Sequence, residues 1–191
     1  MTQPSVRIDP KGLADVNNLL TAYRQGSKKA LYRTVNYGTK QGRKEAVDGM
    51  AKKANLTKTR IREKTTMYFA SLSSLSAKLV IKGGSTPLIH FGASQTKKGV
   101  TFRLWKDKAR ERYRHSFIAK LSPGADKGVY ERDIGSPRYN GRSPLRAKSG
   151  PAVPVIYQRT PGLAKKAEET AAAAMLKELD RQVGLINRGL L

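Results

Sequence analysis

The residues that could carry out acid–base or metal chemistry are few in this chain and widely spaced. The two histidines, His90 and His115, lie far apart in the sequence, and neither has an obvious carboxylate partner. No cysteine is present, which removes disulfides, thiolate metal sites and thiol nucleophiles and fits a reducing cytoplasm. The carboxylates of the predicted β region are Asp107, Glu111, Glu131 and Asp133. We interpret them as charged residues that flank strands rather than as the ligands of a two-metal nuclease site. With no phosphate-binding, dinucleotide or nucleophile motif either, we predict no catalytic residue, no metal and no cofactor.

The chemistry that the chain does favour is contact with a polyanion. It carries 38 Lys and Arg against 14 Asp and Glu, a net charge of +24 on 191 residues. Self-repulsion at this charge destabilises the compact state, so a partner is expected to supply negative charge. Nucleic acid is the usual polyanion, while an anionic membrane or an acidic protein surface would also serve.

Two basic stretches are candidates for contact with DNA phosphates. One surrounds a predicted hairpin, where a solvated surface is an equal alternative, and the other lies in a long loop that could also be solvated or clamp a neighbouring subunit. Trp105 and Tyr113 are interleaved with the first stretch, and we favour packing over base stacking for them. The DNA-facing candidates are Lys97, Lys98, Arg103, Lys106, Lys108, Arg110, Arg112, Arg114, Arg138, Arg142 and Arg146.

Helices are expected at both ends of the chain. The apolar periodicity predicts one helix that begins at Asp9-Pro10 and breaks or kinks at Gly26-Ser27, and a second over 27–54. Glycines on the apolar face of the second helix, Gly38 and Gly42, indicate a closely packed neighbour. A last helix is expected from Leu163 to about Val183, ended by Gly184.

Between these helices the pattern changes to short strands. Strands are predicted near 65–71, 75–82 and 100–105, with a hairpin tip at 97–99, and 115–121 is expected to pair with 128–132. Apolar residues in this region are expected to pack in the core or at a subunit contact: Leu88, Ile89, Phe91, Phe117 and Ile118. The fold class is α+β, with N-terminal helices, a small antiparallel β-sheet, a long basic loop and a C-terminal helix.

This order of elements gives an expected organisation as one domain overall. Its segments are a helix or arm at 1–25, a basic helical part at 26–64, a β region at 65–160 with the long loop 133–154, and a helix and tail at 161–191.

The order and spacing of several short segments resemble the minor tail protein Z family of tailed bacteriophages and prophages. The resemblance runs from about residue 30 to 180 and rests on 55–62 (NLTKTRIR), 79–83 (LVIKG), 87–93 (PLIHFGA), 97–100 (KKGV), 115–119 (HSFIA), 128–132 (GVYER) and 150–154 (GPAVP).

The resemblance implies a non-enzymatic tail-completion or neck protein at the head-proximal end of the tail, which helps head–tail joining and DNA passage. Its expected partners are its own copies in a ring, a hexamer, together with the tail terminator, tail tube and head-closure or portal-side proteins, and double-stranded DNA without sequence preference. No stretch is apolar enough to span a membrane. The expected location is the virion, after assembly in the bacterial cytoplasm. The alternative is a free basic nucleic-acid-binding protein of ribosomal or nucleoid type.

Overall fold

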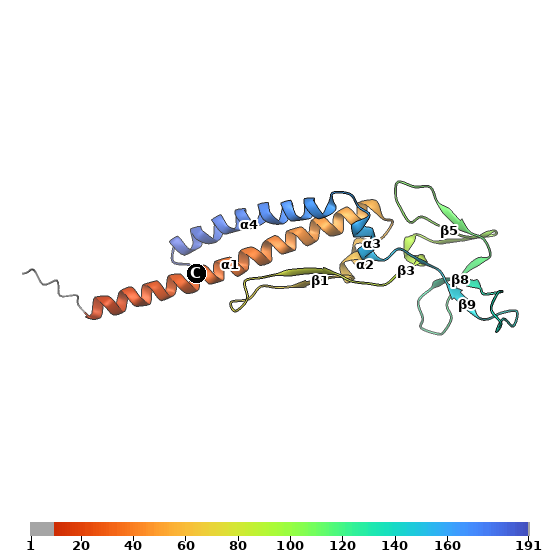
Figure 1. Ribbon diagram of the computed structural model, residues 1–191, viewed down its shortest axis with the longest axis horizontal. Helices are drawn as coiled ribbons and strands as arrows, with labels where there is room; N and C mark the ends of the chain where they lie inside the picture. The colour runs from red at the N-terminus through yellow and green to blue at the C-terminus, as the bar shows by residue number, and fades with distance from the viewer. Residues whose placement is uncertain (1–9, 191) are drawn as a thin grey trace, which may run out of the picture. The chain divides into compact units, whose positions relative to one another are not determined.

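A computed structural model describes residues 10–190, and Figure 1 shows its helices and short strands. The helices are α1 (Pro10–Lys53), α2 (Lys58–Glu63), the 3-10 helix η1 (Leu88–Phe91), α3 (Val153–Gln158) and α4 (Leu163–Asn187). The strands are β1 (Thr65–Tyr68), β2 (Lys78–Ile81), β3 (Thr86–Pro87), β4 (Ser94–Thr96), β5 (Gly99–Phe102), β6 (Glu111–Tyr113), β7 (Ser116–Ala119), β8 (Gly128–Arg132), β9 (Leu145–Ala147) and β10 (Ser149–Gly150). The α+β class is confirmed.

The chain divides into two compact units, and we describe each by itself. Unit 1 comprises Met1–Gln41, Tyr68–Lys78 and Thr170–Leu191, and unit 2 comprises Gly42–Met67 and Leu79–Glu169. The segment boundaries expected from the sequence stay a prediction.

Both long helices pass through glycines that were expected to end or bend them. In α1 the Ser27 hydroxyl donates to the carbonyl of Arg24 (3.0 Å), a bond within the helix, and Gly26 is buried. The expected break at Gly26-Ser27 is therefore wrong, because one glycine costs a helix only about 1 kcal/mol and burial offsets that. The expected stop at Gly184 is also wrong: α4 ends in a turn where the Leu190 N–H donates to the Leu185 carbonyl (3.0 Å).

Unit 2 holds the hydrophobic core. Its central residues come from the end of α1, from η1 and from β5, and Phe91 and Phe102 are fully buried. Leu88 is buried in the same cluster, and Ile89 and Ile118 are partly buried against it. The buried set is Ala46, Val47, Met50, Ala51, Ala54, Leu56, Ile61, Leu88, Phe91, Val100, Phe102, Trp105, Val129, Val153, Ile156, Leu163 and Ala167.

Small antiparallel sheets surround this core. The strand orders are β4-β5-β6 and β7-β8-β9, with two-stranded pairs β10-β3 and β1-β2. The hairpin tip at 97–99 is confirmed, since Thr96 pairs with Gly99 across it, and 116–119 pairs with 128–131 as expected. The charged run after Trp105 contains β6, and the stretch expected as a loop at 133–154 contains β9 and β10.

Unit 1 is built differently, with small and polar residues in its interior. A Cβ on Gly38 would lie 2.2 Å from Cγ of Met175 and 2.9 Å from the carbonyl oxygen of Ala171, so α1 and α4 approach closely here as Gly38 indicated. Among the described residues of this unit, the buried ones are Gly26, Ala30, Thr34, Gly38, Ala70, Glu178 and Gln182. No large apolar side chain of the described part of unit 1 is buried.

Candidate nucleic-acid interface

A hollow of about 660 Å³ in unit 2 brings four cationic side chains together. They are Lys97 and Lys98 at the β4–β5 tip, Arg114 after β6, and Arg132 at the end of β8. No carboxylate lines the hollow. We call this surface the basic hollow; its remaining lining residues are Gln95, Thr96, Gly99, His115, Ser116 and Phe117.

Strand pairing explains why residues so far apart in sequence meet there. The β4–β5 register closes the hairpin so that Lys97 and Lys98 form its tip, and both are exposed. The β5–β6 register opposes Val100 to Tyr113, which puts Arg114 directly beside the tip. Strand β7 forms another side of the hollow. It is held against β4 because the Ile118 N–H donates a hydrogen bond to Oε1 of Gln95 (2.8 Å).

Arg132 is the member of the basic hollow that the sequence reasoning missed. Its guanidinium carbon lies 5.7 Å from the centre of the Phe117 ring, within the range of a cation–π contact. The Phe117 ring also lies 6.4 Å from that of Tyr130. The β7–β8 pairing could have indicated Arg132. Phe117 on β7 opposes Tyr130 on β8, and Arg132 follows Tyr130 by two residues, so it lies on the same face of β8.

Three of the other candidate arginines are used to hold the fold. Arg103 donates through Nε to the Lys108 carbonyl (2.8 Å) and through Nη2 to the carbonyl of Lys106. Nη2 of Arg110 donates to the Gly92 carbonyl (2.7 Å) and to that of Thr101 (3.3 Å). Arg146 forms an ion pair with Asp133 (3.0 Å). These donors are occupied, although their positive charge still adds to the field.

The remaining candidates lie on the surface of unit 2, outside the basic hollow. They are exposed, and no ion pair joins them to another side chain of the described set, residues 21 and 23–190. These residues are Lys106, Lys108, Arg112, Arg138 and Arg142.

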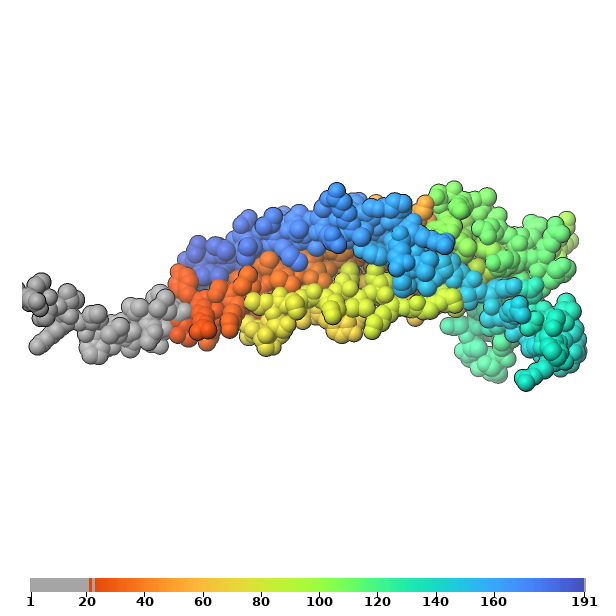
Figure 2. All heavy atoms as spheres, viewed as in Figure 1, coloured from red at the N-terminus to blue at the C-terminus, as the bar shows by residue number. Residues whose placement is uncertain are grey.

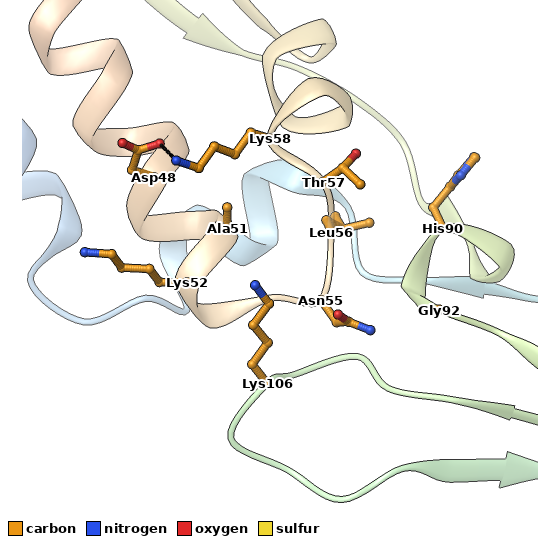
Figure 3. Close-up of a pocket in the computed structure, with 10 residues that line it drawn as sticks. All are labelled: Asp48, Ala51, Lys52, Asn55, Leu56, Thr57, Lys58, His90, Gly92 and Lys106. Atoms are coloured by element: carbon orange, nitrogen blue, oxygen red, sulfur yellow. Dashed lines mark ion pairs between the residues drawn. The ribbon is translucent and has the colours of Figure 1, made fainter.

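A second pocket, of about 560 Å³, contains one of these candidates, Lys106. Figure 3 shows the Lys106 side chain reaching toward the end of α1, whereas the Lys52 side chain extends from that helix away from Lys106. The ammonium of Lys58 is paired with Asp48 (2.8 Å), and this hydrogen bond holds the pKa of the Asp48 carboxyl below its ordinary value. This second pocket therefore has fewer cations outside ion pairs than the basic hollow has.

His90, which also lines this second pocket, does not add to its charge. Burial lowers the pKa of His90 below its ordinary value of 6.5, and the positive charge of the nearby Arg60 lowers it further. The neutral imidazole is therefore the favoured form at pH 7. The basic hollow is therefore the stronger candidate for binding an anion.

Among the side chains that the structure describes, those of residues 21 and 23–190, no group of three His, Cys, Asp or Glu is placed to hold a metal ion. In the same part of the chain, no helix combines the length and the apolar character that a membrane span requires.

The fold and this surface define a basic α+β protein whose one well-formed core carries a cationic hollow. The family model described as prophage minor tail protein Z matches residues 11–188, and the chain belongs to that family. It is thus a phage tail structural protein, a component of the virion that interacts with other phage tail proteins. No curated protein matches the chain significantly, and neither does any solved structure.

Proposed function

We propose that this protein is a non-enzymatic ring subunit at the head-proximal end of the phage tail, where it completes the tail, helps join it to the head and surrounds the passing DNA. The ring is a hexamer, assembled in the host cytoplasm from copies of this chain. Its other neighbours are the tail terminator, the tail tube and the head-closure or portal-side proteins. Membership of the minor tail protein Z family supports the tail location.

The observation that carries the DNA contact is the basic hollow. Lys97, Lys98, Arg114 and Arg132 converge on one surface without a carboxylate among them, which is an arrangement suited to phosphate oxygens. These side chains extend from strands and a hairpin, and none of the four comes from a helix that could present a base-reading pattern. The contact is therefore with the backbone of the duplex and independent of sequence.

The salt dependence of duplex binding tests this contact. Replacing Lys97, Lys98 and Arg114 with alanine should weaken binding to two unrelated duplexes equally and reduce the log–log salt slope by about 2 to 3, since each phosphate contact contributes about 0.9. Arg110 is left intact, because its bonds to Gly92 and Thr101 would confound the result.

A charge-matched control separates the basic hollow from the overall field. It replaces Arg24, Lys28 and Lys177, three exposed cations of unit 1, and should change the slope clearly less. Equal slopes for the two triple variants, or a strong preference for one duplex, would contradict the proposal.

The ring and its location are tested on the particle. Electron microscopy of the tail should show six copies at the head-proximal end, and mass measurement of the assembled particle should agree. A single copy per particle would exclude the ring. A monomer that binds free RNA or ribosomes tightly would favour the alternative, a free basic nucleic-acid-binding protein.

A further inference from the structure

Unit 1 exposes most of the large apolar side chains that the described residues leave uncovered. Of thirteen such side chains, ten belong to this unit, and only Tyr113, Leu121 and Ile134 belong to unit 2. The ten are Tyr23, Leu31, Tyr37, Tyr68, Phe69, Leu72, Leu75, Leu176, Val183 and Leu190. Since the described interior of this unit holds no large apolar side chain, these residues are the apolar surface that a partner would cover.

Part of this surface lies on the segment 69–77, between β1 and β2, which we call the arm. Its sequence, FASLSSLSA, contains no charged residue, and Phe69 and Leu72 are each 52% exposed. Figure 2 shows this region in yellow beside α1 in orange. An uncharged arm that presents aromatic and aliphatic side chains is suited to packing against protein.

The arm is held in a defined conformation. The side chain of Asn36 on α1 clamps Ala70, because its Nδ2 donates to the Ala70 carbonyl (2.9 Å) and its Oδ1 accepts from the Ala70 N–H (2.7 Å). A turn follows in which the Ser71 N–H donates to the Ser74 carbonyl (2.7 Å). The arm is thus built before any partner arrives, which lowers the entropy cost of docking.

The outer face of α4 in the same unit offers a second uncovered apolar surface. Ala172, Ala173, Leu176 and Val183 are all exposed, at spacings that keep them on one side of the helix, and Leu176 is 66% exposed. No charged residue occurs in the stretch 170–176. We call this face the α4 stripe.

Charge indicates what covers these two surfaces. Each copy carries +24, so two copies repel wherever their cations come within a Debye length, about 8 Å at physiological salt. No residue of the arm or of the stretch 170–176 is charged, although Lys40 approaches the arm, with its ammonium 5.6 Å from the centre of the Phe69 ring. Like chains therefore meet there at a lower electrostatic cost than at the strongly basic surfaces. An acidic partner would instead gain most from the strongly basic surfaces.

We infer that the arm of one copy packs against the α4 stripe of the next copy. The two surfaces differ, so the contact is head-to-tail and repeats from copy to copy, as a closed ring requires. The inference names the contact between copies and rests on the proposed ring for its closure.

The absence of cysteine makes a direct test clean. One protein carries only Leu72→Cys and a second only Leu176→Cys, so any disulfide between the two positions must join two chains. Mixed under mild oxidation, they should give the 72–176 product well above the 72–72 and 176–176 products. The control pair replaces Leu72→Cys with Leu121→Cys, an exposed residue of unit 2, and should give little product. A 72–176 yield no higher than the control overturns the inference.

Sedimentation gives an independent readout. Phe69→Ser with Leu72→Ser should weaken self-association about tenfold or more, whereas Leu121→Ser with Ile134→Ser, which are even more exposed in unit 2, should leave it unchanged. Circular dichroism checks that both variants stay folded. A wild-type protein that is monomeric at every concentration tested, or a cross-link from the arm only to a different tail protein, overturns the inference.

The two proposals fail separately. A ring at the tail neck whose contacts exclude the arm would refute this inference and leave the proposed function standing. A 72–176 cross-link in a protein absent from the neck would do the reverse.

Discussion

A Cβ atom on Gly99 would lie 2.1 Å from the carbonyl oxygen of Tyr113, so these two residues fix how closely β5 approaches β6. The backbone φ angle of Gly99 is +120°, a value that residues with a side chain rarely adopt. This close pairing is also what sets Lys97 and Lys98 beside Arg114. One glycine therefore supports both the sheet and the basic hollow.

Substituting Gly99→Ala should destabilise the protein by about 1–3 kcal/mol, because the new methyl group meets backbone on the neighbouring strand. Chemical denaturation followed by the fluorescence of Trp105 measures the change. Gly84→Ala is the control: a Cβ there meets nothing within 4 Å, and the effect should stay within about 0.5 kcal/mol. Equal effects at the two glycines would contradict the close approach.

Arg110 and Arg112 should behave differently although they are neighbours of the same chemistry. Arg110→Ala removes bonds to two backbone carbonyls and should cost about 1 kcal/mol of stability, a value kept low because the side chain is exposed. Arg112→Ala should change stability by less than about 0.5 kcal/mol. Thermal or urea denaturation of the pair decides, and equal losses would show that Arg110 is not an anchor.

Phe91→Ala should cost about 3–5 kcal/mol, since Phe91 is fully buried in the core of unit 2. The Phe91 ring packs directly on Gly150, where a Cβ would lie only 2.5 Å from the ring, and a glycine has no side chain with which to fill the cavity. Urea denaturation reads the loss, and Leu121→Ala, at a side chain 56% exposed, should be nearly neutral. An unchanged midpoint for Phe91→Ala would remove this residue from the core.

Acid should weaken unit 1 through Glu178. Hydrogen bonds from Arg181 (2.6 Å) and Gln182 (2.6 Å) hold the pKa of the buried Glu178 carboxyl below its ordinary value of 4.5. When folding lowers the pKa of a carboxyl, the ionised carboxylate stabilises the folded state at pH values above its pKa in the unfolded chain. That stabilisation is lost as the pH falls through the pKa of the folded state.

The stability difference between wild type and Glu178→Gln should thus be full above pH 5 and shrink steadily below 4.5. Circular dichroism at helix wavelengths, recorded across this pH range, measures it. Glu169→Gln removes an exposed carboxylate 3.9 Å from Lys165 and should show no such trend. A difference independent of pH would mean that Glu178 acts by packing alone.

The sequence predicted the elements whose signals are local. Apolar periodicity predicted the helix of the N-terminal part, the helix propensity of residues such as alanine predicted α4, and alternation with a Lys-Lys-Gly tip predicted the β4–β5 hairpin. Its errors in the helices come from treating glycine as a breaker at Gly26 and Gly184. Gly26 is buried, so packing offsets its cost of about 1 kcal/mol, whereas a Cβ on Gly184 would meet nothing within 4 Å and the flanking residues carry the helix through. Strands β6 and β10 carry no apolar alternation, and β9 (Leu145–Ala147) alternates over only three residues, so their pairing partners specify these strands more than their own side chains do.

The chemistry of the candidate site could be predicted from the sequence, but the set of residues that form it could not. Composition indicated phosphate contact, and Lys97, Lys98 and Arg114 were named. Nothing local separated them from Arg103, Arg110 and Arg146, whose donors are occupied by carbonyls and by Asp133. Arg132 comes from a strand that is distant in sequence, so only the β7–β8 pairing brings it to the hollow.

The uneven distribution of buried apolar side chains has a consequence for local opening. All of the hydrophobic core described above belongs to unit 2, whereas the buried side chains of unit 1 are small or polar. The free energy that resists opening is therefore much smaller in unit 1, and its amide protons exchange with deuterium sooner than those of the core strands. In the free subunit we therefore expect 21–41 and 170–190 to open together as one labile foldon, and a neighbouring chain docked on the arm and the α4 stripe would slow that opening.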